Sequence, residues 1–208
     1  MATSALEPSV LLSSSSSESA TNTKVTLRAP LPGDFGHIIS RHGALYASEF
    51  NYPTRFEALV ARICADFIEN QDPAKERLWI AEELGSGTFL GCVMLVRYKP
   101  EPEDASDTVN SERERETASA ADSTAKLRIL LVEPAARGMG VGKQLVGACV
   151  DFARKVGYKR VVLWTQSSLL AARRLYKAAG FELIKSEEHE SFGVKLVGEF
   201  WELRFPDS

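Results

Sequence analysis

The chain has 208 residues, 44% of them hydrophobic and 25% charged, which is the composition of a soluble globular protein with one domain. Its formal net charge of -3 argues against a protein that holds nucleic acid through its overall charge. No apolar run approaches the roughly 20 residues of a membrane span, and no positive residue precedes Lys24, so we expect no membrane segment or targeting peptide and predict a cytoplasmic location.

The charge is unevenly distributed along the chain. Residues 100–124 carry a net charge of -6, whereas residues 125–208 carry +5. A local basic excess of this size is typical of a site for a small polyanion, because it is too sparse to form a continuous nucleic-acid groove.

Two segments lack the apolar residues that a core requires. Residues 1–23 are serine-rich and contain no aromatic residue, and residues 100–124 are acidic with Val109 as their single large aliphatic residue. We predict that both are disordered, the second as an insertion in a domain that spans 24–208.

The remaining sequence alternates strand and helix patterns and predicts a mixed α/β sheet. Thr54 and Glu57 have the spacing of a capping box at the start of the second helix. Cys64, Cys92 and Cys149 each lie in an apolar run without metal-ligand spacing, so we expect buried thiols and no metal.

In chain order, the pattern gives a strand at 25–28, a helix opening at 30–34 and ending near 47, a helix from 54, strands at 78–82, 89–98 and 127–132, a helix at 140–155, a strand at 161–165, a helix at 168–179, and strands at 181–185 and 199–205.

A glycine-rich turn joins the strand at 127–132 to the following helix. It reads EPAARGMGVGK from Glu133 to Lys143. Helix N-termini carry free N–H groups and about half a positive charge, so a phosphate is the natural ligand. The spacing fits neither a P-loop, which would need glycine at Arg137 and Ser or Thr at Gln144, nor a dinucleotide fingerprint. A turn without any ligand remains the alternative.

The pattern Arg137-x-x-Gly140-x-Gly142 closely resembles the pyrophosphate-binding turn of the GCN5-related N-acetyltransferase (GNAT) family. The order of elements and the segment AARRLYKAAGF, which ends at Phe181, resemble the same family. Segments such as KLRILLVEPAARGMGVG and EHESFGVKLVGEFWELRF are more narrowly similar to bacterial acetyltransferase domains found behind MarR-type winged helices. A winged helix does not fit in 23 disordered residues, so DNA binding is not carried over.

The resemblance implies the GNAT fold, an α/β fold in which two central strands of a mixed sheet splay apart, and acetyl-CoA as acetyl donor. The pantetheine would pair with the strand backbone, and one main-chain N–H would polarise the thioester carbonyl. Tyr176 resembles the family's general acid. Its other interpretation is a helix tyrosine packed on Leu175 and Phe181. The implied cofactor residues are Leu130, Leu131, Val132, Arg137, Gly138, Met139, Gly140, Val141, Gly142, Lys143 and Gln166.

The resemblance identifies the acceptor side less clearly. The two N-terminal helices would wall it, which makes Arg41, His42, Glu49 and Glu57 candidates, and His189 lies between the expected last strands. The candidates for the base are His42, Glu49, Glu57, His189 and water. Arg41 would bind an acceptor carboxylate or pair with Asp34 or Glu49.

We therefore predict transfer of acetyl to a primary amine of a small metabolite by direct attack. A protein lysine or N-terminus as acceptor is one alternative, and a non-catalytic acyl-CoA sensor is another. We expect no nucleic-acid or membrane partner, and a homodimer stays open.

Overall fold

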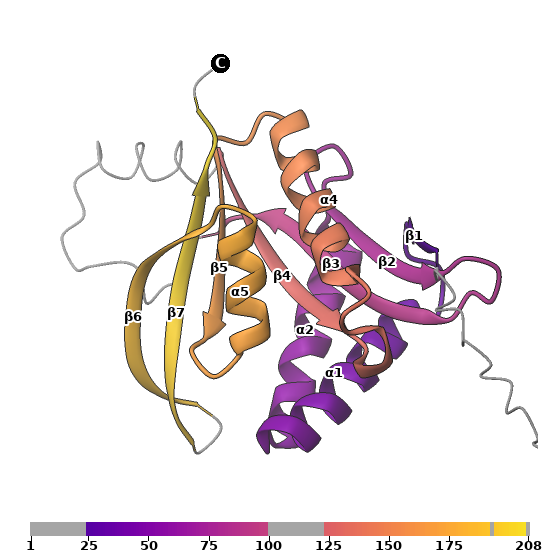
Figure 1. Ribbon diagram of the computed structural model, residues 1–208, viewed down its shortest axis with the longest axis horizontal. Helices are drawn as coiled ribbons and strands as arrows, with labels where there is room; N and C mark the ends of the chain where they lie inside the picture. The colour runs from indigo at the N-terminus through magenta and orange to yellow at the C-terminus, as the bar shows by residue number, and fades with distance from the viewer. Residues whose placement is uncertain (1–23, 100–122, 192–193, 207–208) are drawn as a thin grey trace, which may run out of the picture.

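The computed structural model describes residues 24–99, 123–191 and 194–206, and its centre is a seven-stranded sheet with strand order β1-β2-β3-β4-β5-β7-β6 (Figure 1). All neighbouring strands are antiparallel except β4 and β5, which run parallel. The predicted disordered segment 1–23 and residues 100–122 of the predicted insertion lie outside the described residues. The elements are β1 Val25–Arg28, α1 Asp34–Phe50, α2 Thr54–Asn70, β2 Arg77–Glu83, β3 Phe89–Arg97, β4 Thr124–Val132, a 3-10 turn Pro134–Ala136, α4 Val141–Lys155, β5 Arg160–Gln166, α5 Leu170–Ala178, β6 Glu182–Ser191 and β7 Val194–Arg204.

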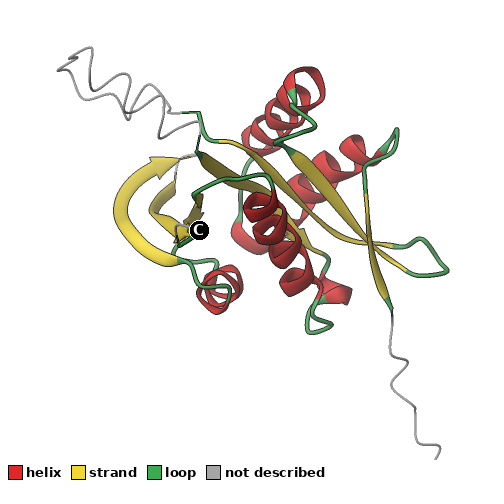
Figure 2. Cartoon of the chain, turned by 90° about the horizontal axis from the view of Figure 1, so that it is seen from above, coloured by secondary structure: helices red, strands yellow, loops and turns green. Residues whose placement is uncertain are grey.

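Helices cover both faces of the sheet, and each face has its own apolar core (Figure 2). Alternate residues of a strand point to opposite faces, so β2 serves both cores. Leu78 and Ile80 pack with α1 and α2, whereas Trp79 and Ala81 pack with α4. This double burial explains why the central strands are nearly continuous apolar runs.

The expected splay of the two central strands is confirmed. The ladder between β4 and β5 runs from Thr124 and Arg160 to Leu127 and Leu163 and ends there, although β4 continues to Val132 and β5 to Gln166. Figure 1 shows the two strands diverging below this point. The carboxyl-terminal half of β4 therefore faces β5 across a gap rather than a ladder.

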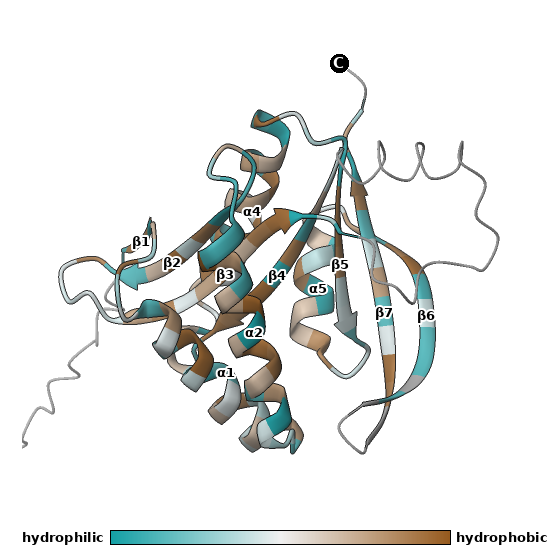
Figure 3. Cartoon of the chain, turned by 180° about the vertical axis from the view of Figure 1, so that it is seen from behind, coloured by the Kyte–Doolittle hydropathy of each residue, from teal (hydrophilic) through white to brown (hydrophobic). Residues whose placement is uncertain are grey.

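Several local expectations were wrong. Helix α2 has Pro53 as its N-cap residue and no side-chain cap, so the capping box from Thr54 does not form. Thr124 belongs to β4 and is buried, so the insertion ends before it. Strands β6 and β7 are longer than predicted. The polar residues of β6 are typical of a loop, which is why the sequence indicated a shorter strand (Figure 3). His189 consequently lies within β6, opposite Leu196, rather than between the strands.

Candidate active site

The glycine turn leads into α4 and leaves helix N–H groups available. Gly138 and Gly140 have φ values of 84° and 79°, which side chains rarely adopt. The first helical hydrogen bond after the turn comes from the Gln144 N–H. The N–H groups of Val141, Gly142 and Lys143 donate to no other backbone group among the described residues. These three donors at the positive end of a helix fit a pyrophosphate.

Gly142 has a different role, which is to allow the close approach of α5. A Cβ at this position would lie 3.0 Å from a methyl group of Leu175 and 3.5 Å from Val132. Helix α5, which carries the candidate acid Tyr176, thus packs directly beside the turn and the end of β4.

Strand β4 contains a bulge that the sequence analysis missed. The register between β3 and β4 shifts between Cys92 and Met94, where Ile129 and Leu130 together oppose Val93. Ile129 has φ 54°, a left-handed conformation that costs a β-branched residue of order 1–3 kcal/mol. The bulge lies where β4 has already left its ladder with β5, so it reorients peptide groups at the gap.

Tyr176 lies in α5 and is 5% exposed. Burial raises its pKa above the ordinary value, and nearby Tyr46 and Cys149 raise it further. The phenol therefore keeps its proton at neutral pH and is a donor rather than a base. Its ring also contacts Phe181, with centroids 5.9 Å apart, so the expected packing is present as well.

Gln166 ends β5, beyond the ladder with β4, and is buried. Its side chain hydrogen-bonds Tyr52, while its Oε1 atom has no partner among the described residues. A buried acceptor without a donor costs about 1–3 kcal/mol. This oxygen at the edge of the gap fits an amide N–H of a bound pantetheine.

Ion pairs hold both charged candidates of α1 to the connection between β4 and α4. Arg41 donates to both carboxylate oxygens of Glu133, at 2.7 Å each, and Arg137 donates to Glu49 at 2.7 Å. Arg41 therefore pairs with neither Asp34 nor Glu49, contrary to expectation. In this structure the guanidinium of Arg137 lies on α1 beside the turn.

His42 is 2% exposed in α1, and burial lowers its pKa to about 4. Its Nδ1 lies 2.9 Å from the carbonyl oxygen of Ile38, which only accepts, so Nδ1 carries the proton of a neutral ring. Nε2 then presents a lone pair, and it has no partner among the described residues. The other acceptor-side candidate of the helices, Glu57, is exposed over Gly43.

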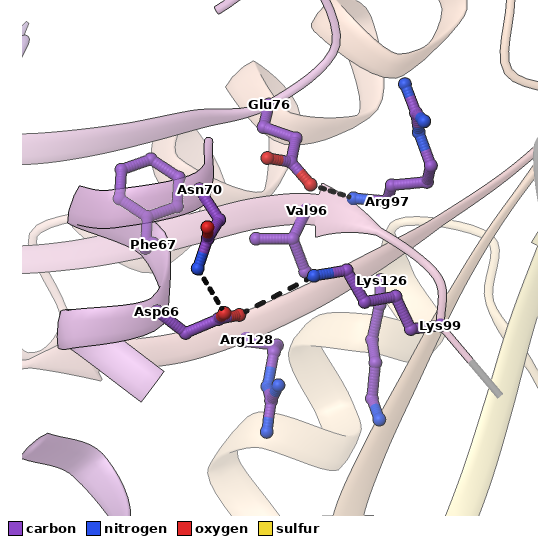
Figure 4. Close-up of a pocket in the computed structure, with 9 residues that line it drawn as sticks. All are labelled: Asp66, Phe67, Asn70, Glu76, Val96, Arg97, Lys99, Lys126 and Arg128. Atoms are coloured by element: carbon purple, nitrogen blue, oxygen red, sulfur yellow. Dashed lines mark hydrogen bonds and ion pairs between the residues drawn. The ribbon is translucent and has the colours of Figure 1, made fainter. Parts of the chain in front are cut away.

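A polar pocket of about 260 Å³ lies elsewhere, between α2, β3 and the first half of β4 (Figure 4). Asp66 in it accepts from Asn70 and pairs with Lys99, and Glu76 accepts from the backbone N–H of Arg97. Its acids are thus engaged within the protein, and the pocket contains none of the predicted site residues.

The described ranges contain no candidate metal site and no candidate membrane-spanning helix. In residues 24–99, 123–191 and 194–206, no cluster of three or more His, Cys, Asp or Glu is arranged to hold a metal ion. Within the same ranges, no helix has the length and apolar character needed to cross a membrane.

Comparison with protein families gives a match to the acetyltransferase (GNAT) family model over residues 44–181, which is more than half of the chain. An uncharacterised N-acetyltransferase of Schizosaccharomyces pombe is 38% identical over 64 residues, covering 31% of this chain and 39% of that protein. A mycothiol acetyltransferase of Beutenbergia cavernae is 32% identical over 71 residues, covering 34% and 23%. The chain thus spans less than two fifths of the length of these relatives.

The fold is similar to that of solved acetyltransferase structures. One is a Salmonella typhimurium protein described as an acetyltransferase and solved with its cofactor acetyl-CoA. The TM-score is 0.64 at 18% identity, over 89% of this chain and 96% of that one. At this identity the likeness establishes the shared fold.

Proposed function

This chain belongs to the acetyltransferase (GNAT) family, and we propose that it transfers an acetyl group from acetyl-CoA to a primary amine of a small metabolite in a ternary complex. The observation that carries the proposal is the early end of the β4–β5 ladder, at Leu127 and Leu163. It leaves a gap lined by strand backbone between a glycine turn that suits a pyrophosphate and a buried protonated phenol.

Acetyl-CoA would supply an activated acetyl thioester to this gap. The residues that would hold it are the backbone of Leu130 to Val132, the turn from Arg137 to Lys143 through the N–H groups of Val141, Gly142 and Lys143, and Gln166 through its unpartnered oxygen. A main-chain N–H near the Ile129 bulge would donate to the thioester oxygen, where negative charge develops.

The amine nitrogen, in its neutral form, forms the new bond to the acetyl carbon as the carbon–sulfur bond breaks. Tyr176 donates its proton to the departing sulfur, and the proton released by the amine passes through water to restore the phenol. Burial of the phenol ensures that it is protonated before the step, although the raised pKa also makes it a weaker acid than an ordinary tyrosine. His42, with its pKa lowered to about 4, is a weak candidate for the base, so we assign this proton transfer to water.

The proposal is tested by free-thiol release from acetyl-CoA in the presence of a panel of amines, beside a direct measurement of acetyl-CoA affinity. Turnover on small amines is expected. Faster turnover on a lysine peptide or a protein N-terminus would support a protein acceptor instead. Tight binding of acetyl-CoA without thiol release on any amine would refute catalysis and support a sensor.

Tyr176→Phe tests the acid separately. We expect kcat to fall at least about tenfold while acetyl-CoA affinity is retained, because general acids contribute about 10²–10⁴-fold. Tyr158→Phe is the matched control, since Tyr158 is also buried but donates to the carbonyl of Lys75, away from the gap. Unchanged turnover of Tyr176→Phe with unchanged binding would remove Tyr176 from the mechanism.

The narrower resemblance to domains found beside MarR-type winged helices remains a prediction.

A further inference from the structure

Four aromatic rings gather where α1 meets α2. We call Tyr46, Phe50, Tyr52 and Phe56 the aromatic wall. The ring of Tyr46 is the centre of the wall, with centroids 4.4 Å from Phe56, 5.4 Å from Phe50 and 5.5 Å from Tyr52. Tyr52 is buried, whereas the residues Tyr46, Phe50 and Phe56 are partly exposed, with the phenol group of Tyr46 turned into the protein. The wall is therefore an apolar surface that a ligand can reach.

Two contacts place the aromatic wall at the gap between β4 and β5. Tyr52 hydrogen-bonds Gln166 at the end of β5, and the phenols of Tyr46 and Tyr176 are close enough to interact electrostatically. Figure 1 shows the α1–α2 connection at the same end of the molecule as the tip of β5. An acceptor amine that reaches an acetyl group in this gap therefore passes the wall.

The charged side chains of α1 beside the wall are already neutralised. Arg41 is held by both oxygens of Glu133, and Glu49 is held by Arg137. A carboxylate on the acceptor would have to break the first pair to gain a guanidinium partner. Losing water without a new partner is costly for a carboxylate, so the α1 side of the wall disfavours it.

The unpartnered acceptors add a second, independent observation. In the described part of the chain, the buried side-chain atoms without any hydrogen bond are His42 Nε2 and Gln166 Oε1. The ring of His42 stacks on Tyr46, with centroids 6.0 Å apart and planes 16° apart, and Gln166 bonds Tyr52. Both atoms accept hydrogen bonds, so the chemistry that completes this region is that of N–H donors.

Resting on the proposed function, we propose that the aromatic wall is the acceptor subsite and that it takes a primary amine carried on an aromatic or alkyl group without a carboxylate. The rings bury the apolar body of the acceptor. The amine supplies an N–H donor to His42 Nε2, while Gln166 Oε1 is left to the amide N–H of the pantetheine.

The first test uses the wild-type protein with saturating acetyl-CoA and reads free thiol for matched amines. Phenethylamine is expected to exceed ethylamine in kcat/KM by roughly tenfold or more, because burying a phenyl group is worth that factor. It is expected to exceed phenylalanine, which adds a carboxylate, by a similar factor. Equal or better rates with phenylalanine, ethylamine or a lysine peptide would overturn this inference and leave the acetyl transfer itself standing. If no amine in the panel causes thiol release, the proposed function and this inference are both refuted.

A second test alters the wall. Phe50→Leu keeps an apolar side chain but removes the ring, and we expect the ratio of kcat/KM for phenethylamine over ethylamine to fall at least about threefold. Phe205→Leu is the matched control, because this partly exposed ring lies at the far end of β7 under Arg154. An unchanged ratio in Phe50→Leu, or an equal fall in both variants, would overturn the assignment. If Phe50→Leu does not fold, the wild-type amine pairs decide the question.

Discussion

The buried imidazole of His42 makes the stability of this protein depend on pH in a defined window. Its pKa is 6.5 in an unfolded chain and about 4 in the native protein, because burial penalises the charged ring. Between these values the unfolded chain binds a proton that the native protein does not. Stability is therefore full above about pH 6.5 and falls as the pH drops towards 4.

The size of the loss follows from the shift. Each unit of difference in pKa corresponds to about 1.4 kcal/mol, so complete protonation of the unfolded chain removes about 3 kcal/mol. Between about pH 7.5 and about pH 5 the expected loss is about 2 kcal/mol. The lowered pKa of Asp34 also links stability to pH, but its window lies below 3.8 and outside this range.

The assay compares wild type with His42→Phe, which keeps a ring against Tyr46 but cannot titrate. Urea unfolding followed by the fluorescence of the three tryptophans gives the free energy of unfolding of each protein at both pH values. The difference in stability between the two proteins is expected to shift by about 2 kcal/mol in favour of His42→Phe on acidification. All other titrating groups cancel in this difference. A difference that stays constant with pH would refute the burial of a neutral His42.

Further predictions concern glycines and one ion pair. Gly140→Ala is expected to lower the free energy of unfolding by about 1–2 kcal/mol, because φ at this position is 79°, although there is space for the Cβ. Gly147→Ala, inside α4, is expected to raise it by about 0.5–1 kcal/mol. Urea unfolding checks both variants, and equal losses would contradict the conformational argument. Gly91→Ala would put a Cβ 2.4 Å from a backbone oxygen of β4, so we expect a loss of at least about 2 kcal/mol, seen as a lower Tm. A double-mutant cycle on Arg41 and Glu133 is expected to give a coupling near 1 kcal/mol, and zero coupling would show that the bidentate pair adds no stability.

Much of the site could be predicted because its signals are local in the sequence. The glycines of the turn report positive φ or close packing at their own positions, and an apolar run between turn residues reports a buried strand. The turn from Arg137 to Lys143 was predicted in this way, whereas the role of the phenol on α5 was implied by the resemblance to the family. The aromatic wall had a local signal too, in the density of rings from Tyr46 to Phe56, which the sequence analysis did not use.

Other features depend on contacts between distant segments and had no local signal. Isoleucine favours extended backbone, so nothing in the sequence marks Ile129 for a left-handed conformation, which is imposed by the register of β4 against β3. The long β6–β7 hairpin forms through ladder hydrogen bonds in spite of a polar sequence.

By itself the sequence determined the family, the order of elements and the glycine-rich turn, because these follow from residue types and spacing along the chain. The tertiary structure alone decided that His42 is buried and neutral, and that Arg41 pairs with Glu133 across 92 residues. Burial and ion pairing depend on which faces of distant elements meet, and chain spacing does not encode that. The proposed preference for an acceptor without a carboxylate rests on the burial of His42 and on the pairing of Arg41 with Glu133.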